Sequence, residues 1–121
     1  MKLCISSKGD SMDSKMDPRF GRAEYFAIAD TETMEYEIVK NSAATSGGGA
    51  GITSGQFITD KGVEVLITGN VGPNAMDVLK AAKIEIYKGE DISLKENIEK
   101  LKGGLLKKIS TTVSPHHGMN K

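Results

Sequence analysis

Two glycine-rich segments hold the residues with the clearest chemical potential, and each precedes a predicted helix. They are NSAATSGGGAGITSGQF (41–57) and TGNVGPN (68–74). Glycine loses much conformational freedom on folding, so a folded chain often places it where another group must approach the backbone closely. The unpaired amides and the dipole of a helix N-terminus favour an anion. The segments therefore predict a cradle of main-chain amides for a negatively charged ligand, made by Gly47, Gly48, Gly49, Gly51, Gly69, Gly72 and Asn74.

Positive charge for such a ligand would come from Arg19 and Arg22, in the polar segment 7–22. The same residues also have explanations that involve no ligand. A glycine-rich loop can be a flexible connection, a small helix face can pack tightly on a sheet, and arginines can be solvated surface charges. The chain contains no GxxxxGK[ST] and no GxGxxG sequence, which excludes a P-loop and disfavours a dinucleotide site.

Other reactive side chains do not form a catalytic pattern. His116 and His117 lie in the segment 110–121, which has no periodicity and is predicted to be a flexible tail; a weak metal site there is the alternative. Asp10, Asp13 and Asp17 would either hold a divalent ion or simply be solvated. Cys4 is expected in the core rather than as a reactive thiol. We therefore predict a protein that is not an enzyme.

The elements that position these residues follow from periodicity. Strands are predicted at 2–6, 23–30, 35–40, 63–69 and 84–89, and helices at about 50–61, from Pro73, and from Leu94 after a capping box of Ser93 and Glu96. The order βββαβαβα predicts an α/β fold: a five-stranded mixed sheet with helices on both faces. The first three strands would form an antiparallel meander and the last two would run parallel to the first. The loops 7–22, 41–51 and 69–73 would then meet outside the carboxyl ends of the strands, where open α/β sheets bind ligands.

Composition narrows the classes of partner. The 121 residues suit one domain, predicted at 1–109, and the 16 basic and 16 acidic residues cancel. A neutral chain without a basic stripe is a poor nucleic-acid binder. One cysteine, no signal peptide and no long apolar run predict a cytoplasmic protein without a membrane partner.

The sequence resembles the dinitrogenase iron-molybdenum cofactor biosynthesis family. The similarity lies in MKLCIS, DPRFGRAEYFAIAD (17–30), SGGGAGI (46–52) and TGNVGPNAMDVLKAAKIEIYKG (68–89), in the family's order, and it covers roughly residues 1–105. The resemblance implies a ribonuclease-H-like fold and the binding of an anionic metal–sulfur cluster. It also adds Phe20 and Gly21 to the candidate site, because nitrogenase-related members often carry His-Phe-Gly there.

Arg19 replaces that histidine, and a guanidinium does not ligate metals as an imidazole does. The resemblance extends to relatives without the histidine, which occur in organisms that fix no nitrogen, and to a relative in sulfate reducers that carries a molybdenum–copper sulfide cluster. The resemblance thus implies a carrier that transiently holds an iron-molybdenum or other molybdenum–sulfur cluster and exchanges it with donor and acceptor proteins. The alternatives are a regulatory module that binds a nucleotide or phosphometabolite in the same crevice and, disfavoured by the lack of acids in 2–6, a nuclease-type enzyme.

Overall fold

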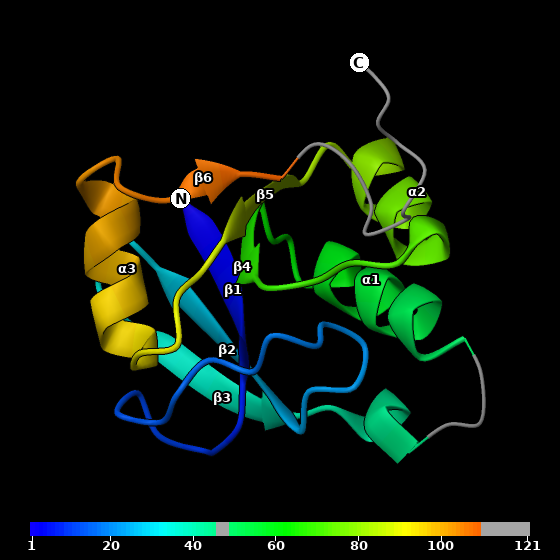
Figure 1. Ribbon diagram of the computed structural model, residues 1–121, viewed down its shortest axis with the longest axis horizontal. Helices are drawn as coiled ribbons and strands as arrows, with labels where there is room; N and C mark the ends of the chain where they lie inside the picture. Colours follow the sequence, from blue (N-terminus) through cyan, green and yellow to red (C-terminus); the bar gives the residue numbers. More distant parts are fainter. Residues whose placement is uncertain (46–48, 110–121) are drawn as a thin grey trace.

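A computed structural model shows one mixed β-sheet flanked by helices, and it describes residues 1–45 and 49–109 (Figure 1). The strands are β1 (Lys2–Ser7), β2 (Tyr25–Asp30), β3 (Tyr36–Lys40), β4 (Val65–Thr68), β5 (Glu85–Lys88) and β6 (Lys107–Lys108). The helices are α1 (Ala50–Asp60), α2 (Pro73–Ala81) and α3 (Leu94–Lys102), with a short 3-10 helix, η1 (Ser42–Thr45). The predicted tail 110–121, with His116 and His117, lies outside the described residues.

The strand order is β3-β2-β1-β4-β5-β6, and β1 lies inside the sheet. β1 pairs antiparallel with β2, and β2 with β3, which confirms the predicted meander. β4 runs parallel to β1, and β5 parallel to β4, as expected for strands joined by helical crossovers. The carboxyl ends of β1, β4 and β5 therefore face the same edge.

The predicted strand number, five, is wrong, because the sheet has six strands. The additional strand, β6, contains two exposed lysines and pairs antiparallel with β5. Two lysines carry no alternation of apolar and polar residues, so the sequence pattern offered no sign of this strand.

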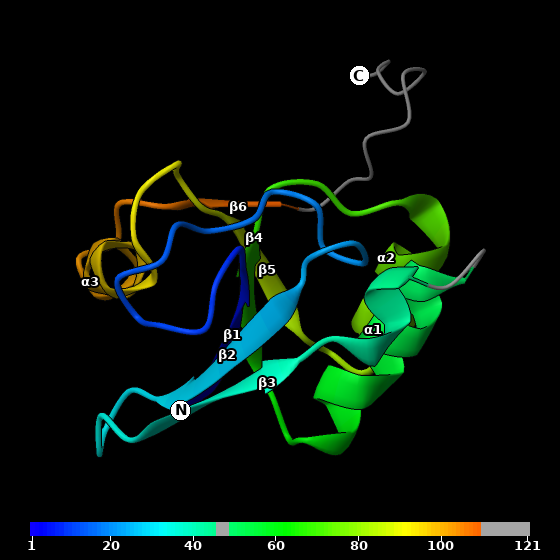
Figure 2. The ribbon, with the colours of Figure 1, turned by 90° about the horizontal axis from the view of Figure 1, so that it is seen from below.

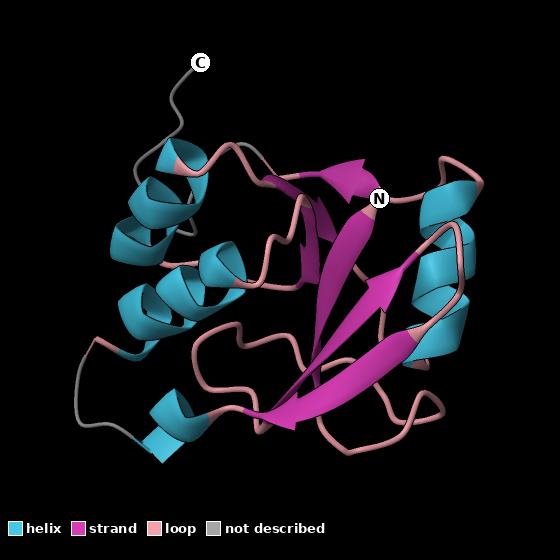
Figure 3. Cartoon of the chain, turned by 180° about the vertical axis from the view of Figure 1, so that it is seen from behind, coloured by secondary structure: helices cyan, strands magenta, loops and turns pink. Residues whose placement is uncertain are grey.

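Each face of the sheet carries its own apolar core, because alternate strand residues point to opposite faces. Cys4, Phe26 and Leu66 pack with α1 and α2 on one face. Leu3, Ile5 and Ile67 pack with Leu94 and Ile98 of α3 on the other. Figures 2 and 3 show the sheet between the α1–α2 pair and α3, so the prediction of helices on both faces is confirmed.

The third helix begins at Leu94, as predicted. The Ser93 hydroxyl accepts a hydrogen bond from the Glu96 amide and the Glu96 carboxylate accepts one from the Ser93 amide, which completes the capping box. α3 ends at Lys102, and Leu105 beyond it is 66% exposed. The ribonuclease-H-like relation implied by the resemblance stays a prediction. Within the described part of the chain, no helix is both long and apolar enough to cross a bilayer.

Candidate functional site

The loop after β1 returns across the end of β4 and lies beside the segment that leads into α2. The Asn70 amide donates to the Pro18 carbonyl at 2.7 Å, and the Phe20 amide donates to the Asn70 carbonyl at 3.4 Å. Below this contact, the buried Ser6 hydroxyl donates to the Asp17 carbonyl at 2.6 Å and lies 2.7 Å from the Thr68 hydroxyl. Residues 17–20 are thus attached to both β1 and β4.

The first turn of α1 packs against this loop and against α2, and both contacts need glycine. A Cβ at Gly21 would lie 2.7 Å from the Gly51 backbone nitrogen, and a Cβ at Gly51 would lie 3.0 Å from the Ala75 Cβ. The absence of side chains at these two positions lets the loop and the two helix starts come together.

A cavity of about 380 Å³ lies where these three segments meet. Eight of the eleven predicted site residues line it: Arg19, Phe20, Gly21, Arg22, Gly49, Gly51, Gly72 and Asn74. Ala50, Ile52, Asn70, Pro73 and Ala75 complete the lining. Gly47 and Gly48 lie outside the described residues.

Gly69 is the predicted residue that the structure places elsewhere. It is buried, and a Cβ there would lie 2.5 Å from the Pro18 Cβ, so this glycine permits close packing of the loop against the end of β4. It lines a different cavity, on the far side of the Pro18 contact. Gly69 is therefore not among the described residues that line the 380 Å³ cavity, and its part in ligand binding stays a prediction.

The two helices at the cavity start without side-chain caps. Gly49, with φ of 74°, precedes α1, and Gly72 precedes α2; neither provides a side-chain hydrogen bond. By helix geometry the amides of Ala50, Gly51 and Ile52 in α1, and of Asn74 and Ala75 in α2, have no intrahelical acceptor. Two helix N-termini therefore bring positive dipole ends to one cavity, together with amide donors for which the described residues provide no side-chain cap. α3, which does not line it, carries a complete cap.

The two arginines differ in their surroundings. The Arg19 Nη2 donates to the Asp17 carboxylate at 2.9 Å and its Nε donates at 3.1 Å, with Asp17 almost fully buried and the Arg19 side chain 65% exposed. The Arg22 guanidinium donates to the Ala44 carbonyl at 3.1 Å. Asp17 thus offsets much of the charge that Arg19 brings to the rim, a pairing that we did not expect from the sequence.

Burial alone would raise the pKa of Asp17, but the hydrogen bonds and charge of Arg19 outweigh this effect, with a further contribution from Lys8. The pKa of Asp17 is therefore lowered, and the carboxylate stays ionised. The Arg19 amide donates to the same carboxylate at 2.9 Å, so the pair also fixes the turn at 17–19.

Phe20 forms the floor of the cavity. Its side chain is 2% exposed and its ring centroid lies 5.5 Å from that of Phe26 in the core. Ligand access to it is limited to the face that lines the cavity.

Asn41 is a positioning residue that the sequence analysis missed. Its buried amide donates to the Gly21 and Ala23 carbonyls, at 3.2 and 2.8 Å, and its oxygen accepts from the Ala43 amide and the Ser54 hydroxyl. It therefore connects the site loop, η1 and α1. It stands at the start of the glycine-rich segment, and an asparagine directly after a strand was the available signal.

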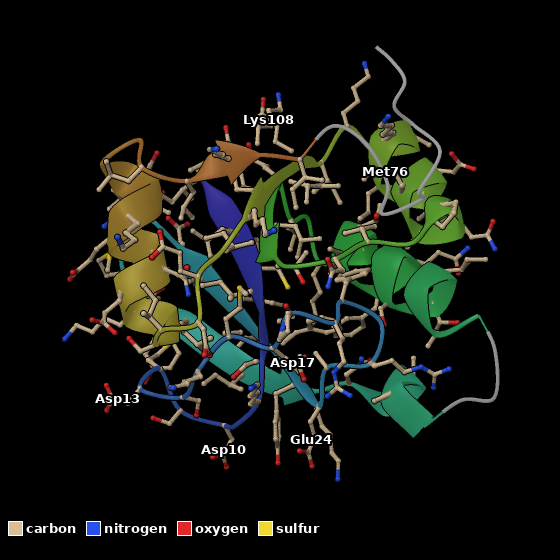
Figure 4. The ribbon with its side chains drawn as sticks, viewed as in Figure 1. Asp10, Asp13, Asp17, Glu24, Met76 and Lys108 are labelled. Carbon is tan, nitrogen blue, oxygen red and sulfur yellow. The ribbon has the colours of Figure 1, made fainter. Side chains whose placement is uncertain are left out.

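The acids of the first loop do not form a metal site. Among residues 1–45 and 49–109, no three His, Cys, Asp or Glu side chains are close enough to hold a metal ion. Figure 4 shows Asp10 and Asp13 on the outer part of the loop and Asp17 nearer the centre of the molecule. Burial raises the pKa of the Cys4 thiol, so Cys4 behaves as the core residue that we expected.

The fold and cavity define a class: a small mixed α/β protein with a cavity of main-chain donors outside its strand ends. The sequence profile of the dinitrogenase iron-molybdenum cofactor family matches residues 1–104, and the chain belongs to this family. An uncharacterized protein of Methanocaldococcus jannaschii is 36% identical over 100 residues, which cover 80% of this chain and 85% of the relative.

Two solved structures are also similar. The apo form of the orange protein from Desulfovibrio gigas is 33% identical, with a TM-score of 0.89, and the match covers 93% of this chain and 96% of that one. A NifB-like protein of Thermotoga is 38% identical, with a TM-score of 0.84, over 94% of this chain and 97% of that one. The resemblance read from the sequence motifs is confirmed at the level of the family.

Proposed function

We propose that this protein is a non-enzymatic carrier that reversibly binds an anionic metal–sulfur cluster, or a precursor of one, in the 380 Å³ cavity. The cluster is cargo that is received from one protein and delivered to another. Membership of the iron-molybdenum cofactor family supports a metallocluster as the ligand.

The observation that carries this proposal is the pair of uncapped helix starts at a single cavity. Each N-terminus favours an anion by about 0.3–1 kcal/mol, and by up to about 2 kcal/mol when partly buried. The described lining residues include two arginines and no acid, so no carboxylate within the lining opposes a negative ligand.

The type of donor favours reversible binding. The lining contains amides, arginines and asparagines, and among the described lining residues there is no cysteine or histidine that would form a metal bond. Sulfide and oxide atoms of an anionic cluster would accept hydrogen bonds from these groups. Many weak bonds hold a ligand and still allow its transfer, which suits a carrier. An iron-molybdenum cluster and a molybdenum–copper sulfide cluster are the candidates.

Asn74→Asp tests the proposal because it separates binding from stability. Asn74 lies in the first turn of α2 and lines the cavity. An added carboxylate there would favour the helix by about 0.3–1 kcal/mol and would repel an anion. Asn74→Ser is the matched control, since it shortens the side chain without adding charge.

Each variant would be reconstituted anaerobically with tetrathiomolybdate and Cu(I), and separately with isolated iron-molybdenum cofactor, then desalted and measured by visible absorption. We expect the wild type and Asn74→Ser to retain a chromophore and Asn74→Asp to lose it, with at least about tenfold weaker binding, while its free energy of unfolding is unchanged or raised. Equal retention by Asn74→Asp, or no retention by the wild type of either cluster, would overturn the proposal.

A further inference from the structure

A second cavity of about 440 Å³ lies on the far side of the contact between Pro18 and Gly69. Its lining comes from the ends of three neighbouring parallel strands: Lys8 follows β1, Gly69 follows β4, and Lys88 ends β5. It therefore lies at the same edge of the sheet as the first cavity. The two share Asn70 in their linings.

The charges around this second cavity are predominantly positive. None of the ion pairs found among the described residues involves Lys8 or Lys88. The acid in the lining, Asp91, lies 4.0 Å from the Lys15 ammonium, and the Asp17 carboxylate, which Lys8 influences, is held by Arg19 at 2.9 Å. The local carboxylates are thus matched by other cations.

The pairing of β5 with β6 adds to this positive charge. Lys88 lies directly opposite Lys107 in the antiparallel ladder. Like charges in directly opposed positions repel each other and destabilise the pair. A bound anion beside Lys88 would reduce this repulsion. Anion binding would therefore also stabilise the pairing of β5 with β6.

Part of the wall is buried, although both lysines are exposed. Met16 is 3% exposed, and Gly69 is also buried. A Cβ at Gly89 would meet the Met16 sulfur and the Ile67 side chain, so this strand end leaves no room for a larger residue. Charge interactions are stronger beside such buried walls than in open water.

We propose that this second cavity binds a small oxyanion of the phosphate class, held by the ammonium groups of Lys8 and Lys88. Binding here is independent of the cluster carrier function, because the Pro18–Gly69 contact separates the two cavities. Lys8 and Lys88 both line this cavity, so a phosphate group bound there would lie beside two lysine side chains, whereas main-chain amides and arginines line the first cavity.

The test is a titration of the full chain with inorganic phosphate, followed by ¹H–¹⁵N NMR against sodium chloride of equal ionic strength. The amides of Gly9, Gly69 and Gly89 report on the second cavity, and those of Gly51 and Asn74 report on the first. Asn70 lines both and is not used as a reporter. We expect saturable shifts in the first group that chloride does not produce.

Lys8→Gln with Lys88→Gln is expected to weaken phosphate binding about tenfold, as the loss of two ionic contacts implies. Lys40→Gln with Lys95→Gln removes the same charge from two exposed lysines that line neither cavity, and should bind like the wild type. The absence of saturable shifts, shifts confined to Gly51 and Asn74, or equal binding by the two double variants would each refute the assignment. Because the cluster test uses absorption and Asn74, failure of one proposal is distinguishable from failure of the other.

Discussion

Arg19 shows how one residue can have a structural partner and still line a candidate site. Its guanidinium forms two hydrogen bonds with the buried Asp17 carboxylate, and its exposed part lines the cavity. The sequence resemblance implied a histidine at this position in nitrogenase-related members, and this protein instead has a cation paired with Asp17. The consequence is a rim that attracts anions less strongly than two unpaired arginines would.

We predict that Arg19→Gln raises the pKa of Asp17. The carboxylate would remain buried without the guanidinium, although it would keep the hydrogen bond from the backbone amide of residue 19. In the wild type the folded-state pKa lies below the ordinary value of about 3.9, so the pair's stabilisation is present above that pH and is lost as the pH falls through the folded pKa. In the variant the folded-state pKa would lie closer to the ordinary value, so the contribution of Asp17 to the loss of stability in acid would be smaller.

Carboxyl ¹³C NMR of Asp17 and urea unfolding between about pH 3 and pH 6 would measure both effects. The double variant Asp17→Asn with Arg19→Gln should lack this contribution to the pH dependence. An Asp17 pKa that does not change when Arg19 is replaced would show that the pair is not the cause.

Asn41→Ala is predicted to cost about 1–3 kcal/mol of stability, because it leaves buried carbonyls of Gly21 and Ala23 without their donor. Ser54→Ala removes only the 3.3 Å bond to Asn41 and should cost less, about 0.5–1.5 kcal/mol. Urea denaturation gives both values. Equal costs for the two variants would mean that Asn41 does not hold the site loop as described.

The three helices differ in how their N-termini are capped. The capped helix lies away from the cavity, and the two helices without a side-chain cap begin at it. α3 has a complete capping box, whereas α1 and α2 start at glycines, and among the described residues no side chain caps them. A glycine at the N-cap forgoes only a few tenths of a kcal/mol relative to a good capping residue. The two uncapped starts are the two at the cavity, which fits a role for a ligand in completing them.

Gly72→Ser should stabilise the protein slightly and weaken cluster binding. Gly72 already has the extended conformation of a capping residue, φ −72° and ψ 168°, and a Cβ there has open space. A serine hydroxyl would pair with a first-turn amide of α2, for a gain of a few tenths of a kcal/mol, and would compete with the anion for that donor.

Ser93→Ala is the matched control at α3, with a loss of about 0.5–2 kcal/mol and unchanged binding. Thermal unfolding and cluster titration of both variants provide the measurements. If Gly72→Ser binds the cluster as tightly as the wild type, the α2 amides do not hold it.

At the scale of the whole molecule, the sheet places its ligand-facing loops at one edge and supports them with an apolar core on each face. Both cavities open at that edge, one on each side of the Pro18–Gly69 contact. The formal net charge is zero, so attraction of an anion depends on local arrangement rather than on the overall field.

Ligand binding should raise the melting temperature of the whole molecule. The identity of the stabilising ligand would distinguish a cluster carrier from a regulator that binds a nucleotide or phosphometabolite. At one hundred times the dissociation constant a ligand adds about 2.7 kcal/mol, which is on the order of 10 °C for a domain of this size. We expect tetrathiomolybdate or a cluster to produce this rise in the wild type and not in Asn74→Asp. A comparable rise with nucleotides alone, lost in the same variant, would favour the regulator.

Local patterns in the sequence were sufficient to predict the elements that build the first cavity. Short apolar runs, alternating in β3 and continuous in β4, mark β1 to β5. The capping box at Ser93 and the proline at Pro73 mark two helix starts at the observed residues. These signals depend on neighbours within a few positions of the chain. The predicted helices also placed glycines at two helix N-termini. The sequence alone therefore indicated main-chain amide donors at these two positions.

Contacts between distant segments were decided only by the tertiary structure. Lys107 and Lys108 became a strand because β5 offered an open edge, and Gly69 faces the second cavity because Pro18 covers its other side. The hydrogen bonds of Asn41 and the cavity that Lys8 and Lys88 both line bring together residues far apart in the chain. These contacts depend on the course of the loops across the edge of the sheet. Local periodicity in the sequence does not predict that course.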